Sequence, residues 1–340
     1  MVLCNVKLLG VTPGNFFVTW VFMSLLGLVT VGITSGMAFW WGFWRPTFET
    51  WSRKTNPRYP SPEKVRDEVV QMIKGLWAAT LCPAFTLWLS KRQYSKAYCS
   101  LDGIDAPHNF MANEHTTSTS YLVFSFAIIW AGSDFFEFMY HRLGHVVQSC
   151  WFVHKHHHHF SNPSPFSVIA DEYADQFVRA TPLILFPLLM PVDLDLLFGI
   201  YTVFFYVYGV YLHTGHELDY PDAHHGWINT SFQHYIHHAT AVYGLPYHCG
   251  FFLKIWDDLG HKLTGKGVYP TMDTAACVCV KCCRMRGERS KARWDELVAS
   301  GGLPDYSCLF SARLWADVAW FSTATAAATT SSSGSHRKEK

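Results

Sequence analysis

The sequence predicts an all-α integral membrane protein with a histidine-rich metal site, and three observations lead to this fold class. Aromatic residues make up 16% of the 340-residue chain, charged residues make up only 16%, and the mean hydropathy is positive. Several apolar segments reach the length that an α-helix needs to cross a bilayer, about 20 residues. Nineteen histidines are present, and most of them fall between His141 and His238. The composition therefore favours a membrane protein over a soluble one.

Net charge and cysteine spacing exclude other classes of protein. The formal net charge of +1 gives no excess of basic residues to neutralise phosphates, so we expect no nucleic-acid partner. The ten cysteines lack the spacing of a small disulfide-bonded domain, and we predict that they are reduced. Four of them lie between Cys277 and Cys283. Zinc binding by four such close neighbours would be strained, so we favour reduced thiols that carry a lipid.

Three segments qualify as membrane-spanning helices, because each is long and rich in Leu, Phe, Trp, Val and Ala. A helix satisfies its own backbone hydrogen bonds where water is absent. The segments are residues 16–44, 69–90 and 121–140. The first is longer than the apolar core of a signal peptide, so we expect an uncleaved span. The second contains Lys74, whose charge is tolerated near the end of a span.

A fourth apolar stretch, residues 177–212, contains too many interruptions for one helix. Three prolines fall within it, and two aspartates follow the last proline, Pro191. Proline removes a backbone donor and breaks a helix interior. An arm of about 15 to 18 residues, at roughly 1.5 Å per residue, would reach deep into the bilayer. We therefore expect a helical hairpin, re-entrant or transmembrane, that turns at the segment Pro-Val-Asp-Leu-Asp.

Basic residues in the short loops predict the orientation, because Lys and Arg are retained on the cytoplasmic side. The loop between the first two spans carries more of them than the loop after the second span. Its basic residues are Arg45, Arg53, Lys54, Arg58, Lys64 and Arg66. With that loop in the cytosol, every histidine cluster falls on the cytosolic face, and we expect a cytosolic cap there.

Four clusters of histidines supply enough imidazoles for two metal ions. An H-x3-H pair at the end of the third span places two rings on one helical face. Two H-x2-H-H clusters follow, each expected to present a shared face, and an H-x2-H pair lies between them. Imidazole binds iron, zinc and copper, so the residue type alone does not name the metal. The candidate ligands are His141, His145, His154, His157, His158, His213, His216, His234, His237 and His238.

Further residues are candidates for contacts around these ligands. A ligating imidazole passes its other N–H to a carboxylate or a carbonyl. Glu137 and Asp134 lie one and two helical turns before His141. His248 is either an added ligand or a neighbour of the ligands. The acidic candidates are Asp134, Glu137, Asp171, Glu172 and Asp257.

At these residues the sequence resembles the fatty acid hydroxylase superfamily, whose members carry H-x3-H, H-x2-H-H and a final H-x2-H-H in this order. The resemblance covers roughly residues 134–260, from Asp134 to the Trp256-Asp257 pair and its neighbours. The segment 163–166, Pro-Ser-Pro-Phe, is similar to sterol C-5 desaturases. The segment 171–174, Asp-Glu-Tyr-Ala, is instead similar to C-4 methylsterol oxidases. In one departure, His248-Cys249 stands where members carry Asn-Tyr.

The resemblance implies a multi-pass enzyme of the endoplasmic reticulum membrane whose active site faces the cytosol. Such an enzyme uses two non-haem Fe ions and O2 to desaturate or hydroxylate a C–H bond of a membrane lipid, here a sterol in sterol biosynthesis. Electrons would come from NAD(P)H through a cytochrome b5-type donor, and no catalytic residue beyond the metal ligands is expected. The implied domains are residues 1–120, a membrane region with two spans; 121–265, the catalytic domain; and 266–340, a cytosolic cysteine-containing segment with a disordered tail.

Other functions stay open at this point. A fatty acid or sphingolipid hydroxylase, or a C-4 methylsterol monooxygenase, would use the same ligands. A membrane protein that binds or transports metal without catalysis is a third alternative. Transport requires polar residues within the spans, whereas these histidines lie at span ends and in loops. A relative whose metal site is only structural is a fourth.

Overall fold

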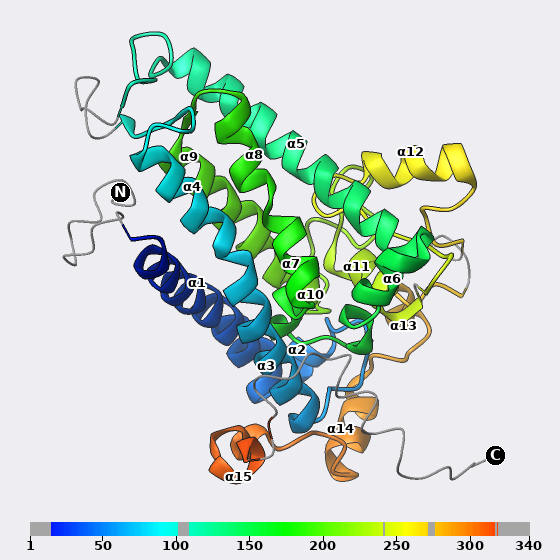
Figure 1. The fold of residues 1–340 in the computed structure, drawn as a ribbon. Helices are drawn as coiled ribbons and strands as arrows, with labels where there is room; N and C mark the ends of the chain where they lie inside the picture. The colour runs from blue at the N-terminus through cyan, green and yellow to red at the C-terminus, as the bar shows by residue number, and fades with distance from the viewer. Residues whose placement is uncertain (1–14, 101–108, 241, 271–275, 317, 319–340) are drawn as a thin grey trace.

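The computed structural model consists mainly of helices (Figure 1). It describes residues 15–100, 109–240, 242–270, 276–316 and 318. Four of the described helices are long and apolar enough to cross a membrane: Phe16–Trp44, Pro62–Lys91, Thr119–Val146 and Leu194–His213. The first three contain the three predicted spans, and the fourth is one arm of the predicted hairpin. The predicted disordered tail lies outside the described residues.

The first apolar helix begins with a side-chain cap. In α1 (Phe16–Phe39) the Asn15 side chain accepts the N–H of Phe17 at 3.0 Å, and the helix continues as the π-helical turn η2 (Trp40–Trp44). Many of its large apolar side chains are exposed, Met37 by 68%. Such a surface suits contact with lipid.

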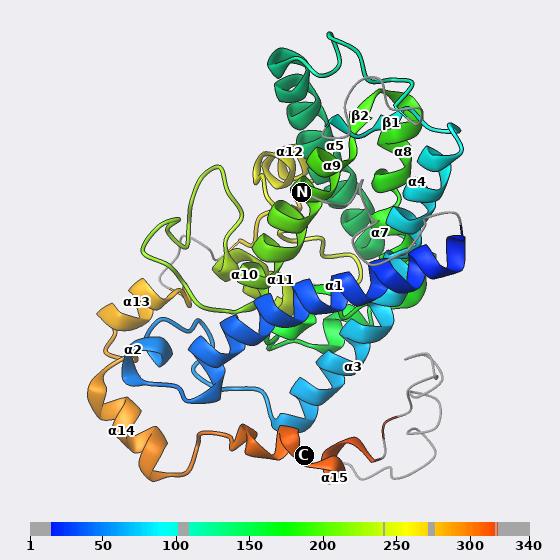
Figure 2. The ribbon, with the colours of Figure 1, turned by 90° about the vertical axis from the view of Figure 1, so that its left-hand side faces the viewer.

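The second apolar helix reaches the region of the histidines. It consists of α3 (Pro62–Ala79) and α4 (Leu81–Lys91), and α1 packs across both of them (Figure 2). Glu68 on α3 is buried, and its carboxylate accepts the backbone N–H of Ser164 at 3.0 Å. This contact holds the 3-10 turn η5 (Pro165–Ile169) beside α3. α3 therefore positions the chain that follows the second histidine cluster.

The third apolar helix, α5 (Thr119–Val146), carries the H-x3-H pair in its last turns. It spans roughly 40 Å at 1.5 Å per residue, so its two ends lie at opposite ends of the bundle. Two short helices follow it directly. They are α6 (Gln148–His154) and the 3-10 turn η4 (His157–His159), which together hold the first H-x2-H-H cluster.

The predicted hairpin is present, and it extends along the bundle. Its tip is the strand β2 (Val192–Asp193), which pairs in parallel with β1 (Ala97–Tyr98) in the loop between the second and third apolar helices. The tip thus lies at the bundle end opposite the histidines, which fits a transmembrane hairpin. One arm contains α7 (Tyr173–Ala180) and α8 (Pro182–Leu189); the other contains α9 (Leu194–Ile200), the π-helix η6 (Tyr201–Val207) and α10 (Tyr208–His213).

Cys99 corrects one expectation. It is disulfide-bonded, whereas the other eight cysteines within the described residues are free. The prediction that all cysteines are reduced is therefore wrong. Cys99 directly follows β1 at the hairpin-tip end of the bundle. Sequence spacing gave no sign of this bond, because a disulfide depends on two cysteines meeting in space.

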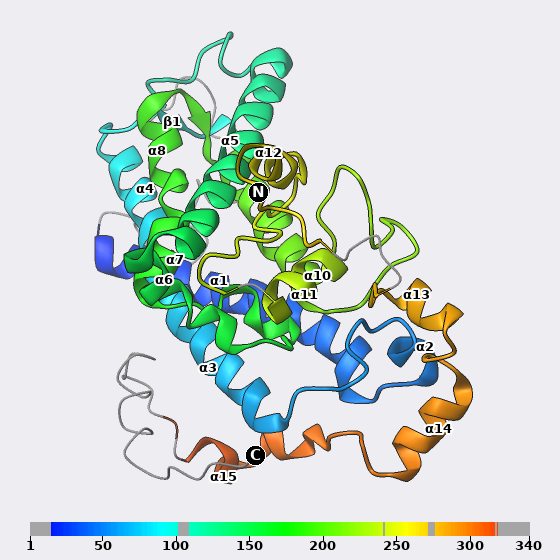
Figure 3. The same cartoon turned by 90° about the vertical axis from the view of Figure 1, so that its right-hand side faces the viewer.

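The remaining helices gather around the end of the bundle where α5 and α10 finish (Figure 3). α11 (Ser231–Thr240) packs against α10, and α12 (Ile255–Thr264) contacts α5. A helical cap at the histidine end agrees with the sequence analysis, while its cytosolic location stays a prediction. The other elements are α2 (Phe48–Trp51), α13 (Val280–Met285), α14 (Lys291–Ala299), the 3-10 turn η7 (Tyr306–Phe310) and α15 (Ala312–Trp315).

Asp193 provides a test of the hairpin tip. Its carboxylate accepts the N–H of Leu196 at the start of α9 and the N–H of Ser100, both at 2.9 Å. We expect Asp193→Ala to lower the free energy of unfolding by about 1–3 kcal/mol, because a helix cap is lost and two partly buried donors lose their acceptor. Asp193→Asn keeps a capping oxygen and should lose less. Thermal unfolding in detergent measures both, and equal losses would contradict the capping role.

Candidate metal centre

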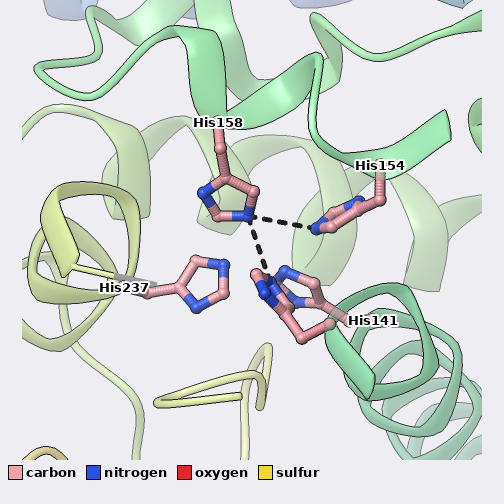
Figure 4. Close-up of side chains that lie close together, drawn as sticks. His141, His154, His158 and His237 are labelled. Atoms are coloured by element: carbon pink, nitrogen blue, oxygen red, sulfur yellow. Dashed lines mark hydrogen bonds between the residues drawn. The ribbon is translucent and has the colours of Figure 1, made fainter. Parts of the chain in front are cut away.

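Site A gathers five histidines from four separate elements (Figure 4). Their ligand nitrogens all lie within 4.8 Å of one another. α5 contributes two rings from residues four apart, which lie on one helical face and point to one centre. α6, η4 and α11 contribute one ring each. The members of site A are His141, His145, His154, His158 and His237.

Site B gathers four more histidines, whose ligand nitrogens also lie within 4.8 Å of one another. α11 contributes two rings from residues four apart, and the end of α10 and η4 contribute one each. All four side chains are buried. The members of site B are His157, His213, His234 and His238.

The two sites are neighbours, because each pair of consecutive histidines is divided between them. His158 belongs to site A and His157 to site B; His237 belongs to site A and His238 to site B. The ring centres of His158 and His238 are 5.4 Å apart. Consecutive helical residues point about 100° apart, so such a pair faces two centres. The prediction of one shared face for each H-x2-H-H cluster is therefore wrong, since only residues four apart share a site.

Backbone carbonyl oxygens face the outer ring nitrogens of four of these histidines. Each Nδ1 atom donates to its carbonyl, which fixes the neutral form with the proton on Nδ1. The lone pair of Nε2 then points inward and can bind a metal. The pairs are His141 with Cys249 (3.0 Å), His145 with Val242 (3.4 Å), His213 with Gly209 (2.7 Å) and His237 with Tyr247 (2.6 Å).

Carboxylates face two further histidines. The Nδ1 atom of His154 lies 3.0 Å from a carboxylate oxygen of Asp175, and that of His157 lies 2.7 Å from Asp171. Both aspartates are buried. A carboxylate in this position orients the ring and makes its inner nitrogen a better ligand.

Arg179 connects these carboxylates to the predicted residue Glu137. Its guanidinium lies 2.8 Å from Asp171 and also forms an ion pair with Glu137. Glu137 therefore reaches site B through Arg179 and Asp171 rather than by touching a histidine. Sequence reasoning named Glu137 and Asp171 but missed Arg179 and Asp175. Their charge could have indicated a functional role, because Asp175 and Arg179 lie at the start of an otherwise apolar hairpin arm.

The inner nitrogens face one another without enough protons to pair them. In site A, Nε2 of His158 lies 3.1 Å from Nε2 of His145 and 3.2 Å from Nε2 of His154. In site B the two corresponding contacts measure 3.0 and 3.2 Å. Where Nδ1 carries the proton, Nε2 offers only a lone pair. Within the described part of the chain, the Nε2 atoms of His141 and His237 are buried without a hydrogen-bond partner. A cation in each site would satisfy these atoms, so the residues fit metal ions.

Burial favours the neutral form of these histidines. For five members outside the apolar helices, burial lowers the pKa well below its ordinary value, and neighbouring rings lower it further. The imidazoles are then ready to bind a metal without first losing a proton. The residues with this lowered pKa are His157, His158, His234, His237 and His238.

Asp134 and Asp257 support a loop that contacts a ligand, and neither touches a histidine itself. Asp134 accepts the backbone N–H of Phe252 at 2.7 Å. Asp257 accepts the N–H of Cys249 at 2.8 Å, and the carbonyl of Cys249 faces His141. These two carboxylates therefore hold the loop in the position from which its carbonyl orients the ring.

His216 and His248 lie outside both sites. α10 ends at His213, and the chain then turns, so His216 packs against Trp41 with 5.1 Å between the ring centres. An H-x2-H pair is held close on one side of a helix only while the helix continues. The Nε2 atom of His248 accepts the backbone N–H of Tyr269 at 3.2 Å. The structure thus brings nine of the ten candidate ligands together and leaves His216 apart.

Comparisons with known proteins agree with this geometry. Residues 126–261 match the family described as fatty acid hydroxylase. A Delta(7)-sterol 5(6)-desaturase of Aspergillus fumigatus is 25% identical over 247 residues, 72% of this chain and 60% of the relative. A lathosterol oxidase of Rattus norvegicus is 26% identical over 199 residues, 58% of this chain and 60% of the relative. The chain thus spans about 60% of the length of these relatives. No solved structure matches the chain.

Metal content tests the two sites. We expect His237→Ala and His234→Ala each to bind less than half the transition metal of the wild-type chain, because each removes a ligand from one site and disturbs its neighbour. His216→Gln is the matched control and should keep the wild-type content. Elemental analysis of the purified proteins measures this. A loss in His216→Gln as large as in His237→Ala would contradict the division of ligands.

Asp171 tests the contacts around the ligands. We expect Asp171→Asn to weaken metal binding roughly 10- to 100-fold, because the carboxylate that orients His157 is lost. Asp258→Asn is the control, since Asp258 is half-buried and its ion-pair partner is Lys254, 4.0 Å away. Competition with a calibrated chelator measures the affinities. Unchanged affinity in Asp171→Asn would show that the contact does not support the metal.

Proposed function

Since residues 126–261 form a domain of the fatty acid hydroxylase family, we propose that the chain is a membrane-bound, O2-dependent lipid oxidoreductase of the sterol desaturase type. The observation that carries the proposal is the pair of adjacent all-imidazole sites at one end of an apolar helix bundle. We assign a non-haem Fe ion to each site. The proposed ligands are the five histidines of site A and the four of site B.

Bound iron would supply the activation of O2 that removal of hydrogen from an unactivated carbon requires. The residues of the chain do the remaining work. The carbonyl and carboxylate partners hold the rings, and burial excludes water from the site. Exclusion of water prevents side reactions at a reactive centre. Eight of the nine proposed ligands are buried, and His158 is partly buried.

A small cavity suggests where the substrate meets the sites. It has a volume of about 50 Å³, lies inside the helix bundle and is lined by Glu137 and Arg179 on one side. Tyr201, Phe205 and Phe251 line other parts of it. Apolar and aromatic walls with a few polar groups are typical of a lipid-binding site. The cavity is well below the size of a ligand pocket, so we propose that it widens when the reacting end of a sterol enters from the bilayer.

Features at both ends of the bundle support one orientation of the protein. The histidine end lies next to the loop that is rich in basic residues, which are retained on the cytoplasmic side. The opposite end carries the disulfide-bonded Cys99, and disulfides persist in oxidising compartments. We propose a multi-pass protein of the endoplasmic reticulum membrane with sites A and B facing the cytosol. A cytochrome b5-type donor, reduced by NAD(P)H, would deliver electrons there.

A second candidate is hydroxylation of a fatty acyl chain, a sphingolipid or a C-4 methylsterol. The name of the matching family, fatty acid hydroxylase, favours it. Both reactions begin with removal of a hydrogen atom, and they differ in whether a second hydrogen leaves or an oxygen is added. We place desaturation first because the named relatives are sterol desaturases and sterol oxidases.

Turnover by the reconstituted protein tests the proposal. The full chain in lipid nanodiscs would receive a Delta(7)-sterol, O2, cytochrome b5 and its reductase with NADH. We expect a product that lacks two hydrogens and forms only with all components present. His157→Ala should reduce the rate at least about 1,000-fold, because a proposed ligand is lost. Mass spectrometry of the extracted lipids measures the product.

Each other result distinguishes an alternative. A product that gains one oxygen would support hydroxylation instead. Iron without turnover on sterol, fatty acyl or sphingolipid substrates would support a protein that binds metal without catalysis. Wild-type turnover by His157→Ala would overturn the assignment of site B.

A further inference from the structure

A third cluster of metal-binding side chains lies apart from sites A and B. Ligand atoms of His224, Cys277 and Cys279 all lie within 4.8 Å of one another. The Nε2 atom of His224 is 3.3 Å from the sulfur of Cys277. The thiol of Cys282 interacts with the thiols of both Cys277 and Cys279. Residues more than 50 positions apart in the sequence thus form one Cys-Cys-His group, and Cys282 lies beside its two cysteines.

The cluster is built into the packing behind α11. Cys277 and Cys279 are buried against Phe232 and Ile236, which lie on α11 together with the histidines of sites A and B. The ring of His224 meets the edge of Phe232 with 5.2 Å between ring centres. The three side chains therefore have few alternative orientations. A site made of packed side chains is more precise than one made of mobile surface groups.

Local geometry also suits thiolate ligands. The backbone N–H of Cys279 donates to the sulfur of Cys277 at 3.5 Å, a contact that stabilises negative charge on sulfur. A tetrahedral zinc ion with Zn–S near 2.3 Å and Zn–N near 2.0 Å separates its ligand atoms by roughly 3.5 to 3.8 Å. The separation of 3.3 Å between His224 and Cys277 is close to that range, and the Cys279 sulfur lies within 4.8 Å of both ligand atoms. A cavity of about 380 Å³, lined by His224 and Cys279, gives an ion access from solvent.

We propose that His224, Cys277, Cys279 and Cys282 bind a structural zinc ion. Three thiolates and one imidazole form a closed tetrahedral set with no open position for chemistry. The ion would fasten the segment that begins α13 to the rear of α11, and so steady the helix that carries ligands of both sites. Zinc binding by four neighbouring cysteines would be strained, and His224 replaces one of them. Lipid attachment to Cys277 or Cys279 does not fit, because both side chains are buried.

Elemental analysis of the full chain, purified in detergent without chelators, tests the proposal. We expect about one zinc per wild-type chain and less than about 0.1 in Cys277→Ser and in His224→Gln, because a closed site with one ligand removed binds weakly. Cys283→Ser is the matched control, since the Cys283 thiol donates to the carbonyl of Val278 at 3.3 Å instead. That control should keep its zinc.

Two further measurements separate this proposal from failed folding and from the iron sites. Iron is counted in the same samples, so loss of zinc with iron retained locates the defect at the third cluster. Cobalt exchanged into the wild-type chain should give the absorption of a tetrahedral thiolate complex. Equal zinc in wild type and Cys277→Ser, absence of both zinc and the cobalt signal from wild type, or a lipid attached to Cys277 would overturn the proposal.

Discussion

The constraint on which the structure depends is the packing of nine imidazoles, eight of them buried, whose inner nitrogens face one another. Such an arrangement is unfavourable without cations, because buried acceptors that lack donors cost free energy. The surrounding groups make it specific. Carbonyl and carboxylate partners accept hydrogen bonds from the outer nitrogens of five rings, which leaves the unprotonated nitrogen inside, and Asp171 lies 2.7 Å from the outer nitrogen of a sixth ring, His157. The contacts that pack these rings are therefore also the contacts that would prepare sites A and B for metal ions.

The helix bundle supplies the platform for that arrangement. α5 and α10 both end at the same level, so their final turns deliver His141, His145 and His213 to one place. The hairpin tip is held at the far end by β1 and β2, which fixes how far α10 can reach. A second level of support comes from Asp134 and Asp257, which hold the loop behind His141. Contacts at both ends of the bundle thus position the apolar helices and the two histidine sites.

Much of this architecture could be predicted from the sequence, and the failures have physical causes. Helical residues four apart face one way, so the pairing of His141 with His145 was visible. The turn after α10 was not visible, and it removes His216 from the group. Every residue has a backbone carbonyl, so the sequence does not show which carbonyl will face a histidine. The contacts of the Cys249 and Tyr247 carbonyls with His141 and His237 could therefore not be predicted. The same holds for contacts between distant segments, such as His224 with Cys277, and for the disulfide of Cys99.

The doublets His157-His158 and His237-His238 have a consequence for how such a protein can change over evolutionary time. Each doublet gives one ring to site A and the next ring to site B. The orientation of both rings therefore depends on the same rotation of the local helix. Inserting or deleting one residue ahead of a doublet would rotate both rings together and damage both centres at once. Selection on either site therefore acts against an insertion or deletion ahead of a doublet.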